Sequence, residues 1–111
     1  MHDPASIRLV YVACKDLKEA RRIGQAIVQE GLCACVNILG DIESMYQWEG
    51  KFINESEIAF LCKTSVEKIE PLVARIRELH SYECPGIVSW TADQGNPAFF
   101  DWVQKSTSAR E

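Results

Sequence analysis

The sequence predicts an α+β fold, a two-layer sandwich of the ferredoxin-like type with βαββαβ order and an added C-terminal helix. Short β-branched and apolar runs alternate with stretches whose apolar residues recur at helical spacing. No internal repeat or linker interrupts them, and a length of 111 residues suits one compact domain. We therefore expect a single domain over residues 1–111, with residues 1–6 as a disordered tail.

The predicted elements follow one another with clear breaks between them. Glycine, proline, asparagine and acidic residues mark these breaks, as is typical of turns and helix ends. In chain order we expect a strand over 7–14, a helix over 17–30, strands over 33–39, 42–48 and 57–63, a helix ending at 79, a strand over 86–92 and a helix over 97–106.

The three helix starts carry local signals. Asp16 can accept a hydrogen bond from the first-turn amides while Glu19 reaches back toward the cap. Residues 64–67, TSVE, are typical of a second capping box, and Pro71 either kinks the following helix or marks its true first turn. Residues 96–97, Asn-Pro, predict a cap followed by a proline at the first helical position.

Two turn signals lie between the first and second helices. Residues 40–41, Gly-Asp, separate two extended runs and predict a hairpin between them. Residues 48–51, WEGK, predict a further turn, flanked by the aromatic side chains of Tyr46, Trp48 and Phe52. One subunit of this size cannot bury so long a ribbon, so we expect the ribbon to pair with the sheet edge of a neighbouring subunit.

Both faces of the predicted sheet are apolar. In the first strand Ile7, Leu9 and Tyr11 share one face, and Val10 and Val12 share the other. Two helices cover only one face of such a sheet, so the other face is most cheaply buried against copies of the same chain. We therefore predict a homo-oligomer.

Composition and charge exclude several classes of partner. Twelve Lys and Arg against sixteen Asp and Glu give a net charge of −4, and no basic run is present, so we expect no nucleic-acid partner. The N-terminal residues lack the features of a signal peptide, and no segment approaches the ~20 apolar residues that span a bilayer. Five cysteines, an odd number, favour reduced thiols. We predict a cytoplasmic protein without membrane contact.

A cysteine pair stands at the start of the second predicted strand. At ~3.3 Å per residue the alpha carbons of Cys33 and Cys35 lie about 6.6 Å apart, at the far limit of disulfide geometry. A thiolate pair on one strand face can hold a soft ion such as Cu(I), whereas small buried cysteines are common core filler. We favour filler for Cys33 and keep Cys35 as a candidate ligand.

Residues 79–84, LHSYEC, gather side chains that can bind metals. His80, Glu83 and Cys84 offer an imidazole, a carboxylate and a thiol beside Tyr82. The alternative is that His80 caps the helix C-terminus, where a partly positive imidazole meets the helix dipole, and the spacing alone favours this alternative.

Five stretches together resemble the CutA divalent-cation-tolerance family. In family order they are CACVNI, YQWEGKF, ESEIAFLCKT, LHSYECP and GNPAFFDW, and they are distributed over residues 33–102. The resemblance implies a ferredoxin-like subunit in a tight homotrimer, with an architecture similar to that of the PII signal transducers. It also implies a link to tolerance of copper and other divalent cations.

The resemblance also identifies candidate site residues near clefts between subunits. Cys35, Trp48, Lys63, His80 and Tyr82 occupy family positions. Cys33 does not, because the family usually has alanine there.

The leading functional hypothesis is a trimeric protein that binds copper or zinc. Cys35 and His80, with Glu83, are the predicted metal ligands, and Cys84 is a further candidate. The predicted cofactor is copper or another divalent cation such as zinc, and we predict that folding does not require it.

Two alternatives belong to other classes. A PII-like regulator would hold a small anionic ligand in the cleft, with Lys63 as the counter-charge and Trp48 and Tyr82 as walls. An enzyme would use Cys35 as nucleophile and His80 as base, but no third, orienting residue is visible. Phosphate-loop, zinc-protease and G-x-S-x-G motifs are also missing from the sequence, so we predict no enzymatic activity.

Overall fold

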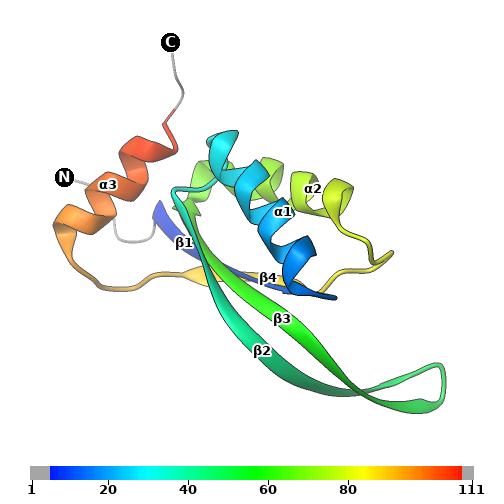
Figure 1. Ribbon diagram of the computed structural model, residues 1–111. Coiled ribbons are helices and arrows are strands. Elements are labelled where there is room, and N and C mark those ends of the chain that lie inside the picture. Colours follow the sequence, from blue (N-terminus) through cyan, green and yellow to red (C-terminus); the bar gives the residue numbers. More distant parts are fainter. Residues whose placement is uncertain (1–5, 109–111) are drawn as a thin grey trace.

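A computed structural model describes residues 6–108 of the chain (Figure 1). The predicted α+β class and the βαββαβ order are confirmed. The elements are β1 (Ile7–Cys14), α1 (Leu17–Gln29), β2 (Cys35–Trp48), β3 (Lys51–Ser65), a 3-10 turn (Val66–Lys68), α2 (Ile69–Leu79), β4 (Ile87–Thr91) and α3 (Pro97–Ser106).

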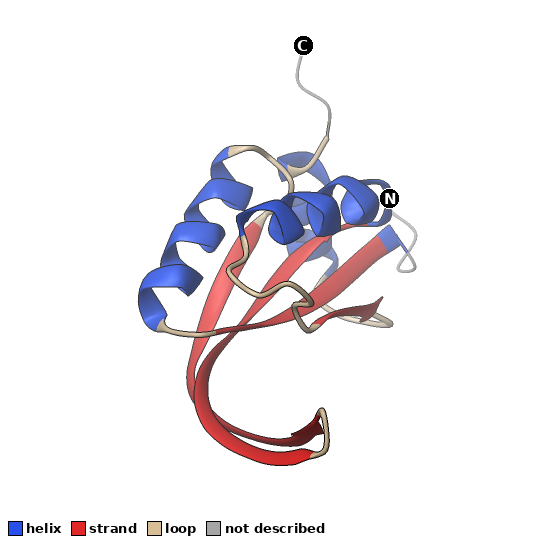
Figure 2. Ribbon diagram, turned by 90° about the vertical axis from the view of Figure 1, so that its right-hand side faces the viewer, coloured by secondary structure: helices blue, strands red, loops and turns tan. Residues whose placement is uncertain are grey.

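The four strands form one antiparallel sheet in the order β2-β3-β1-β4. Helices α1 and α2 cover one face of this sheet, and the core lies between the two layers (Figures 1 and 2). Val10 and Val12 of β1 and Phe60 of β3 meet Ile23 of α1 and Ile76 of α2 there, all fully buried. Among residues 6–108 no helix combines the length and apolar character needed to cross a membrane.

The predicted hairpin at residues 40–41 is wrong. β2 runs unbroken through this point, and its register against β3 shifts between Ile38 and Gly40. Gly40 has φ +99°, a left-handed conformation that glycine adopts without steric cost, so the extra residue forms a bulge inside the strand. The chain reverses later, at Glu49 and Gly50, where both residues have positive φ as tight hairpin turns require.

Two of the predicted helix starts are confirmed. Asp16 Oδ1 accepts a hydrogen bond from the Glu19 amide at 2.8 Å, and Glu19 Oε1 in turn accepts one from the Lys15 amide at 3.0 Å. The Asn96 side chain accepts from the Ala98 amide, with proline at the first position of α3. These contacts satisfy amides that have no partner within a helix.

The capping box predicted at residues 64–67 is wrong. Thr64 is buried at the end of β3, and its hydroxyl donates to the Leu32 carbonyl at 2.8 Å. A 3-10 turn follows, and α2 begins only at Ile69 with Pro71 in its first turn. Tertiary burial therefore overrides the local pattern here, and Pro71 marks the true first turn because its missing N–H costs nothing there.

The third helix packs at one end of the sheet. Phe100 and Val103 of α3 bury Ile7, the first residue of β1. Of the tail predicted at residues 1–6, residues 1–5 lie outside the described residues, and the Ser6 hydroxyl donates to Gln104 of α3 at 3.0 Å. Because helix α3 lies at one end of the sheet (Figure 1), it leaves large side chains of the second sheet face exposed.

The open sheet face carries large apolar side chains. The register places Leu9 and Tyr11 of β1, Leu61 of β3 and Val88 and Trp90 of β4 together on it. Val88 is 55% exposed and Trp90 is 43% exposed. The sequence prediction that both faces are apolar is confirmed.

The β2–β3 ribbon extends well beyond the helical layer and curves as it does so (Figure 1). Met45, Tyr46, Trp48 and Phe52 near its tip are all at least 40% exposed. The ribbon therefore presents large apolar side chains that one chain leaves uncovered, as the sequence predicts.

Candidate functional site

His80 belongs to a buried group of side chains that could bind a metal ion. It follows the last residue of α2, and its side chain is fully buried. Nε2 lies 2.8 Å from the Ala13 carbonyl oxygen, and the Tyr82 amide donates to Nδ1 at 3.1 Å. Because a carbonyl only accepts, Nε2 carries the proton and Nδ1 keeps a lone pair.

Glu19 joins the start of α1 to the loop after α2. One carboxylate oxygen caps the Lys15 amide, and the other accepts from the Ser81 amide at 2.7 Å and lies 3.9 Å from His80 Nδ1. Burial raises the pKa of Glu19, but the hydrogen bonds from Lys15 and Ser81 outweigh it, so the pKa lies below its usual value. Glu19 is therefore ionised at neutral pH although it is only 2% exposed.

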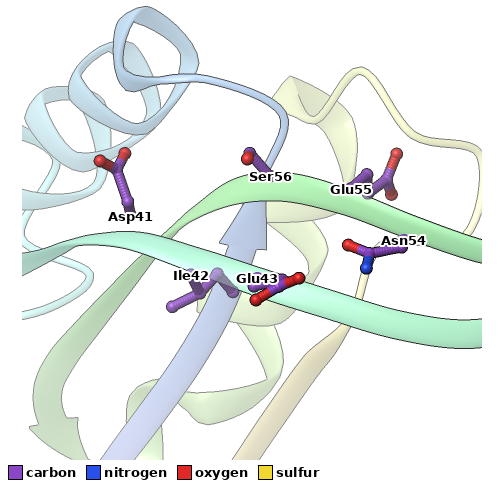
Figure 3. Close-up of a pocket in the computed structure, with 6 residues that line it drawn as sticks. All are labelled: Asp41, Ile42, Glu43, Asn54, Glu55 and Ser56. Atoms are coloured by element: carbon purple, nitrogen blue, oxygen red, sulfur yellow. The ribbon is translucent and has the colours of Figure 1, made fainter.

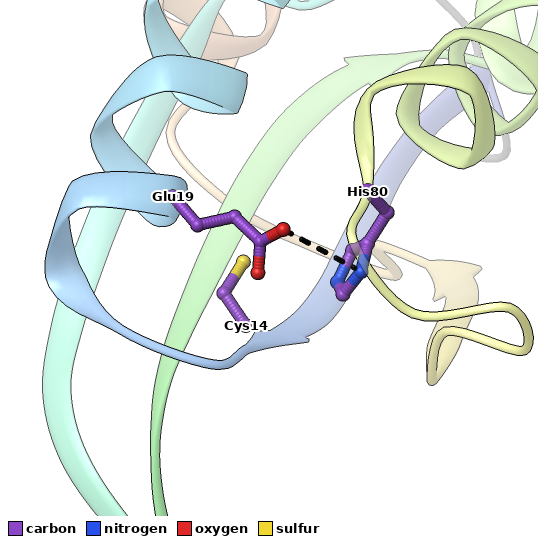
Figure 4. A group of neighbouring side chains, drawn as sticks. All are labelled: Cys14, Glu19 and His80. Atoms are coloured by element: carbon purple, nitrogen blue, oxygen red, sulfur yellow. Dashed lines mark ion pairs between the residues drawn. The ribbon is translucent and has the colours of Figure 1, made fainter.

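Cys14 ends β1 beside these two groups (Figure 4). Burial, together with the negative charges of Glu19 and Glu57, raises the pKa of the Cys14 thiol to about 12. The free protein therefore holds a protonated thiol beside an ionised carboxylate and the Nδ1 atom of His80.

The ligand atoms of Cys14, Glu19 and His80 all lie within 4.8 Å of one another. This is the one group among residues 6–108 in which three such side chains converge so closely. All three residues come from different elements, the end of β1, the first turn of α1 and the end of α2. The sheet and the two helices therefore hold the group in place.

Two members of this cluster were missed by the sequence analysis. Cys14 ends a buried strand, which is the pattern of a core residue, and Glu19 was assigned only to a helix cap. His80 meets Ala13 across a separation of 67 residues. The spacing of residues along the sequence does not indicate such a contact. The predicted packing of both helices on one face of the sheet, however, brings the ends of β1 and α2 together.

Cys35 and Lys63 lie elsewhere, opposite each other on β2 and β3. Lys63 pairs with Leu9 of β1, whereas His80 contacts Ala13 of the same strand. Leu9 and Ala13 are four residues apart, which corresponds to about 13 Å along the strand. Within one chain, therefore, Cys35 is not brought to His80. Burial raises the pKa of the Cys35 thiol, although the positive charge of Lys63 opposes this.

Trp48, Tyr82 and Glu83 are brought together in a cavity of about 520 Å³ between the ribbon and the loop at residues 80–86. The Tyr82 hydroxyl donates to Glu57 at 2.8 Å, and burial together with this hydrogen bond raises the pKa of Tyr82. Lys63 donates to Asn37 and does not line this cavity. Trp48 and Tyr82 therefore share a site without Lys63.

A second hollow of about 380 Å³ lies along the middle of the ribbon. Its side chains are spread along both strands and do not gather around one point (Figure 3). They are Asp41, Ile42, Glu43, Asn54, Glu55 and Ser56. Its carboxylates do not form a group with the spacing of metal ligands, in contrast to the cluster at His80.

Comparison with known families gives a match over residues 8–106 to the family described as "CutA1 divalent ion tolerance protein". The chain belongs to this family. The resemblance identified from the sequence is thereby confirmed.

Relatives with curated names agree with this membership. The chain is 34% identical to Protein CutA of Mus musculus over 96% of its own length and 60% of that protein, so it spans about three fifths of this relative. It is also 34% identical to the divalent-cation tolerance protein CutA of Thermus thermophilus, over 89% of this chain and 96% of that one. A relative of Arabidopsis thaliana is named chloroplastic, so location varies among CutA proteins.

Solved CutA1 structures have the same fold. The Xylella fastidiosa CutA structure superposes with a TM-score of 0.91 at 31% identity, covering 93% of this chain and 99% of that one. The CutA structure of Archaeoglobus fulgidus, described as a periplasmic divalent cation tolerance protein, gives 0.89 at 32% identity, covering 92% and 99%.

Proposed function

We propose that this CutA1-family chain is a cytoplasmic, homotrimeric protein of divalent-cation tolerance that binds copper or zinc at Cys14, Glu19 and His80. The convergence of their three ligand atoms within 4.8 Å carries the proposal. Thiolate, imidazole and carboxylate are ligands that copper and zinc accept. Cys35 and Glu83 lie outside this group within one chain, and the proposed site does not include them.

The hydrogen bonds of His80 favour the same site. Metal-bound histidines commonly donate their second ring N–H to a backbone carbonyl, which fixes the tautomer and aims the other nitrogen at the ion. Here Nε2–H donates to Ala13, and Nδ1 is the nitrogen that faces Glu19. An ion at Nδ1 takes the place of the Tyr82 amide, the present partner of that lone pair.

The proposed assembly rests on the exposed apolar surfaces. The open sheet face carries Tyr11, Val88 and Trp90, and the ribbon tip carries Trp48. A single chain does not bury these apolar surfaces, whereas a neighbouring subunit would. Burying one such aromatic side chain contributes about 2 to 3 kcal/mol, and a three-fold assembly repeats the contact at each interface. The ribbon also has a free edge on β2, which can add to a neighbouring sheet.

The alternative with an anionic ligand has less support. Lys63, its counter-charge, does not line the cavity that holds Trp48 and Tyr82. The charged residues that line this cavity are Glu55, Glu57 and Glu83. Their carboxylates repel anions, so we assign the protein to cation binding.

A cobalt titration tests the metal site. Co²⁺ replaces zinc in thiolate sites and gives a thiolate-to-metal absorption band, which reports a Co–S bond directly. We expect the band in the native protein and in Cys35→Ser, and its loss in Cys14→Ser. Cys35→Ser is the control, because it makes the same substitution at a half-buried thiol outside the cluster. A band that survives in Cys14→Ser would exclude this cysteine as a ligand.

A further inference from the structure

The cavity between the ribbon and the loop at residues 80–86 has a lining suited to an organic cation. Its volume of about 520 Å³ is within the range that holds small molecules. Besides small residues and Cys84, its walls consist of aromatic rings and carboxylates. The aromatic residues are Tyr46, Trp48 and Tyr82, and the acidic residues are Glu55, Glu57 and Glu83.

The charged side chains that line this cavity are all negative. No lysine, arginine or histidine among residues 6–108 lines it. Glu57 is only 8% exposed, and among residues 6–108 it forms no salt bridge; its carboxylate accepts a hydrogen bond from the Tyr82 hydroxyl. A carboxylate that is nearly buried without a positive partner is stabilised by a cation that enters beside it.

The same lining argues against a bare metal ion here. The carboxylates of Glu55, Glu57 and Glu83 do not converge to the spacing of metal ligands, unlike the ligand atoms at His80. Aromatic rings do not replace the missing oxygen ligands, but their faces attract ammonium groups and cover alkyl chains. The cavity therefore fits a cation with a charged nitrogen and an apolar part.

We infer that this cavity binds an alkylammonium ion, a primary amine or polyamine. Its ammonium group lies beside Glu57, and its alkyl part lies against the ring of Tyr82. Glu55 is held by the Tyr46 hydroxyl at 2.5 Å and adds a second negative charge at the rim. The inference uses different residues from the proposed metal site and does not depend on it.

Calorimetric titration of the full chain with butylammonium and with butan-1-ol tests this inference. The two probes share their alkyl chain and differ in charge, so we expect butylammonium to bind at least about tenfold more tightly, equivalent to ~1.4 kcal/mol. Mg²⁺ at equal charge concentration should not displace it. Equal binding of the alcohol, displacement by Mg²⁺ or no measurable binding of butylammonium would each overturn the inference.

Variants locate the site. Glu57→Gln keeps the shape of the side chain and should weaken butylammonium binding about tenfold. Tyr82→Leu removes a ring face and should weaken it about threefold. Glu43→Gln makes the same charge change on the ribbon outside the cavity and should leave affinity unchanged. If Glu57→Gln does not fold, Glu83→Gln at an exposed position of the same cavity takes its place. Equal effects of the cavity and control variants would contradict the assignment.

Discussion

The loop at residues 80–86 separates two regions that both contain acidic residues but differ in their burial and in the spacing of their side chains. On its inner side, the ligand atoms of Cys14, Glu19 and His80 lie within 4.8 Å and are buried. On its outer side, Glu55, Glu57 and Glu83 are spread around a wide cavity with aromatic walls. We therefore expect the convergence of ligand atoms, and not the number of acidic residues, to decide what kind of cation a region binds.

The largest effect should come from Trp48, which belongs to the outer region. Trp48→Glu places a charge in the proposed interface and removes aromatic burial of about 2 to 3 kcal/mol at each of three contacts. We expect monomers or aggregates in size-exclusion chromatography with light scattering. Trp102→Glu on α3, at a similarly exposed tryptophan, should leave the assembly intact. A trimer of Trp48→Glu with the native melting temperature would contradict the role of the ribbon.

A smaller effect should follow from His80, on the inner side. His80→Ala leaves a buried void and removes the contacts with Ala13 and Tyr82, so it should lower the free energy of unfolding by about 3 kcal/mol. Glu83→Ala, on the exposed outer side of the same loop, should change it by less than about 0.5 kcal/mol. Chemical denaturation measures both, and equal losses would show that the two sides of the loop are alike.

Glu19 tests the electrostatic part of the comparison. Glu19→Gln leaves one of the amides of Lys15 and Ser81 facing an NH₂ group, so it should cost about 2 kcal/mol at pH 7. The pKa of Glu19 is lowered by folding, so its carboxylate stabilises the protein above the unfolded value and loses this contribution as pH falls through the folded pKa. Denaturation curves of the native protein and the variant should therefore converge in acid. A constant difference down to the lowest pH at which the protein folds would contradict this account.

The smallest effect concerns the proton on Cys14. Because its pKa is raised to about 12, the thiol is protonated at neutral pH and must lose its proton to bind zinc. Zinc affinity should therefore rise by up to about tenfold, or ~1.4 kcal/mol, for each unit of pH between 6 and 8. Competition with a chelator measures this slope. A Cys14→Ser variant should lose most of it, whereas an unchanged slope would assign the released proton to another group.

The elements of the fold were largely predictable because their apolar patterns and helix caps are local. The errors arose at Gly40, where a bulge imitates a turn, and at Thr64, where burial against Leu32 overrides a capping pattern. Both errors depend on residues of distant elements. The ends of β2 and β3 therefore could not be predicted from the local sequence alone.

The candidate site was predicted less completely. His80 was identified both from its residue type and from the family resemblance, but its neighbours Cys14 and Glu19 are distant in sequence and were assigned to the core and to a cap. Cys35 belongs to a Cys-Ala-Cys pattern that is easy to notice in the sequence. In the structure, Cys35 lies on another part of the sheet, opposite Lys63. The fold, and not the spacing of cysteines, determines which thiol meets the histidine.

X-ray absorption spectroscopy of the zinc-loaded protein tests the metal site most directly. We expect one sulfur at about 2.3 Å and nitrogen or oxygen ligands at about 2.0 to 2.2 Å from zinc. The sulfur should remain in Cys35→Ser and disappear in Cys14→Ser. A spectrum with oxygen ligands alone, or one whose sulfur depends on Cys35, would contradict the assignment of the ion to Cys14, Glu19 and His80.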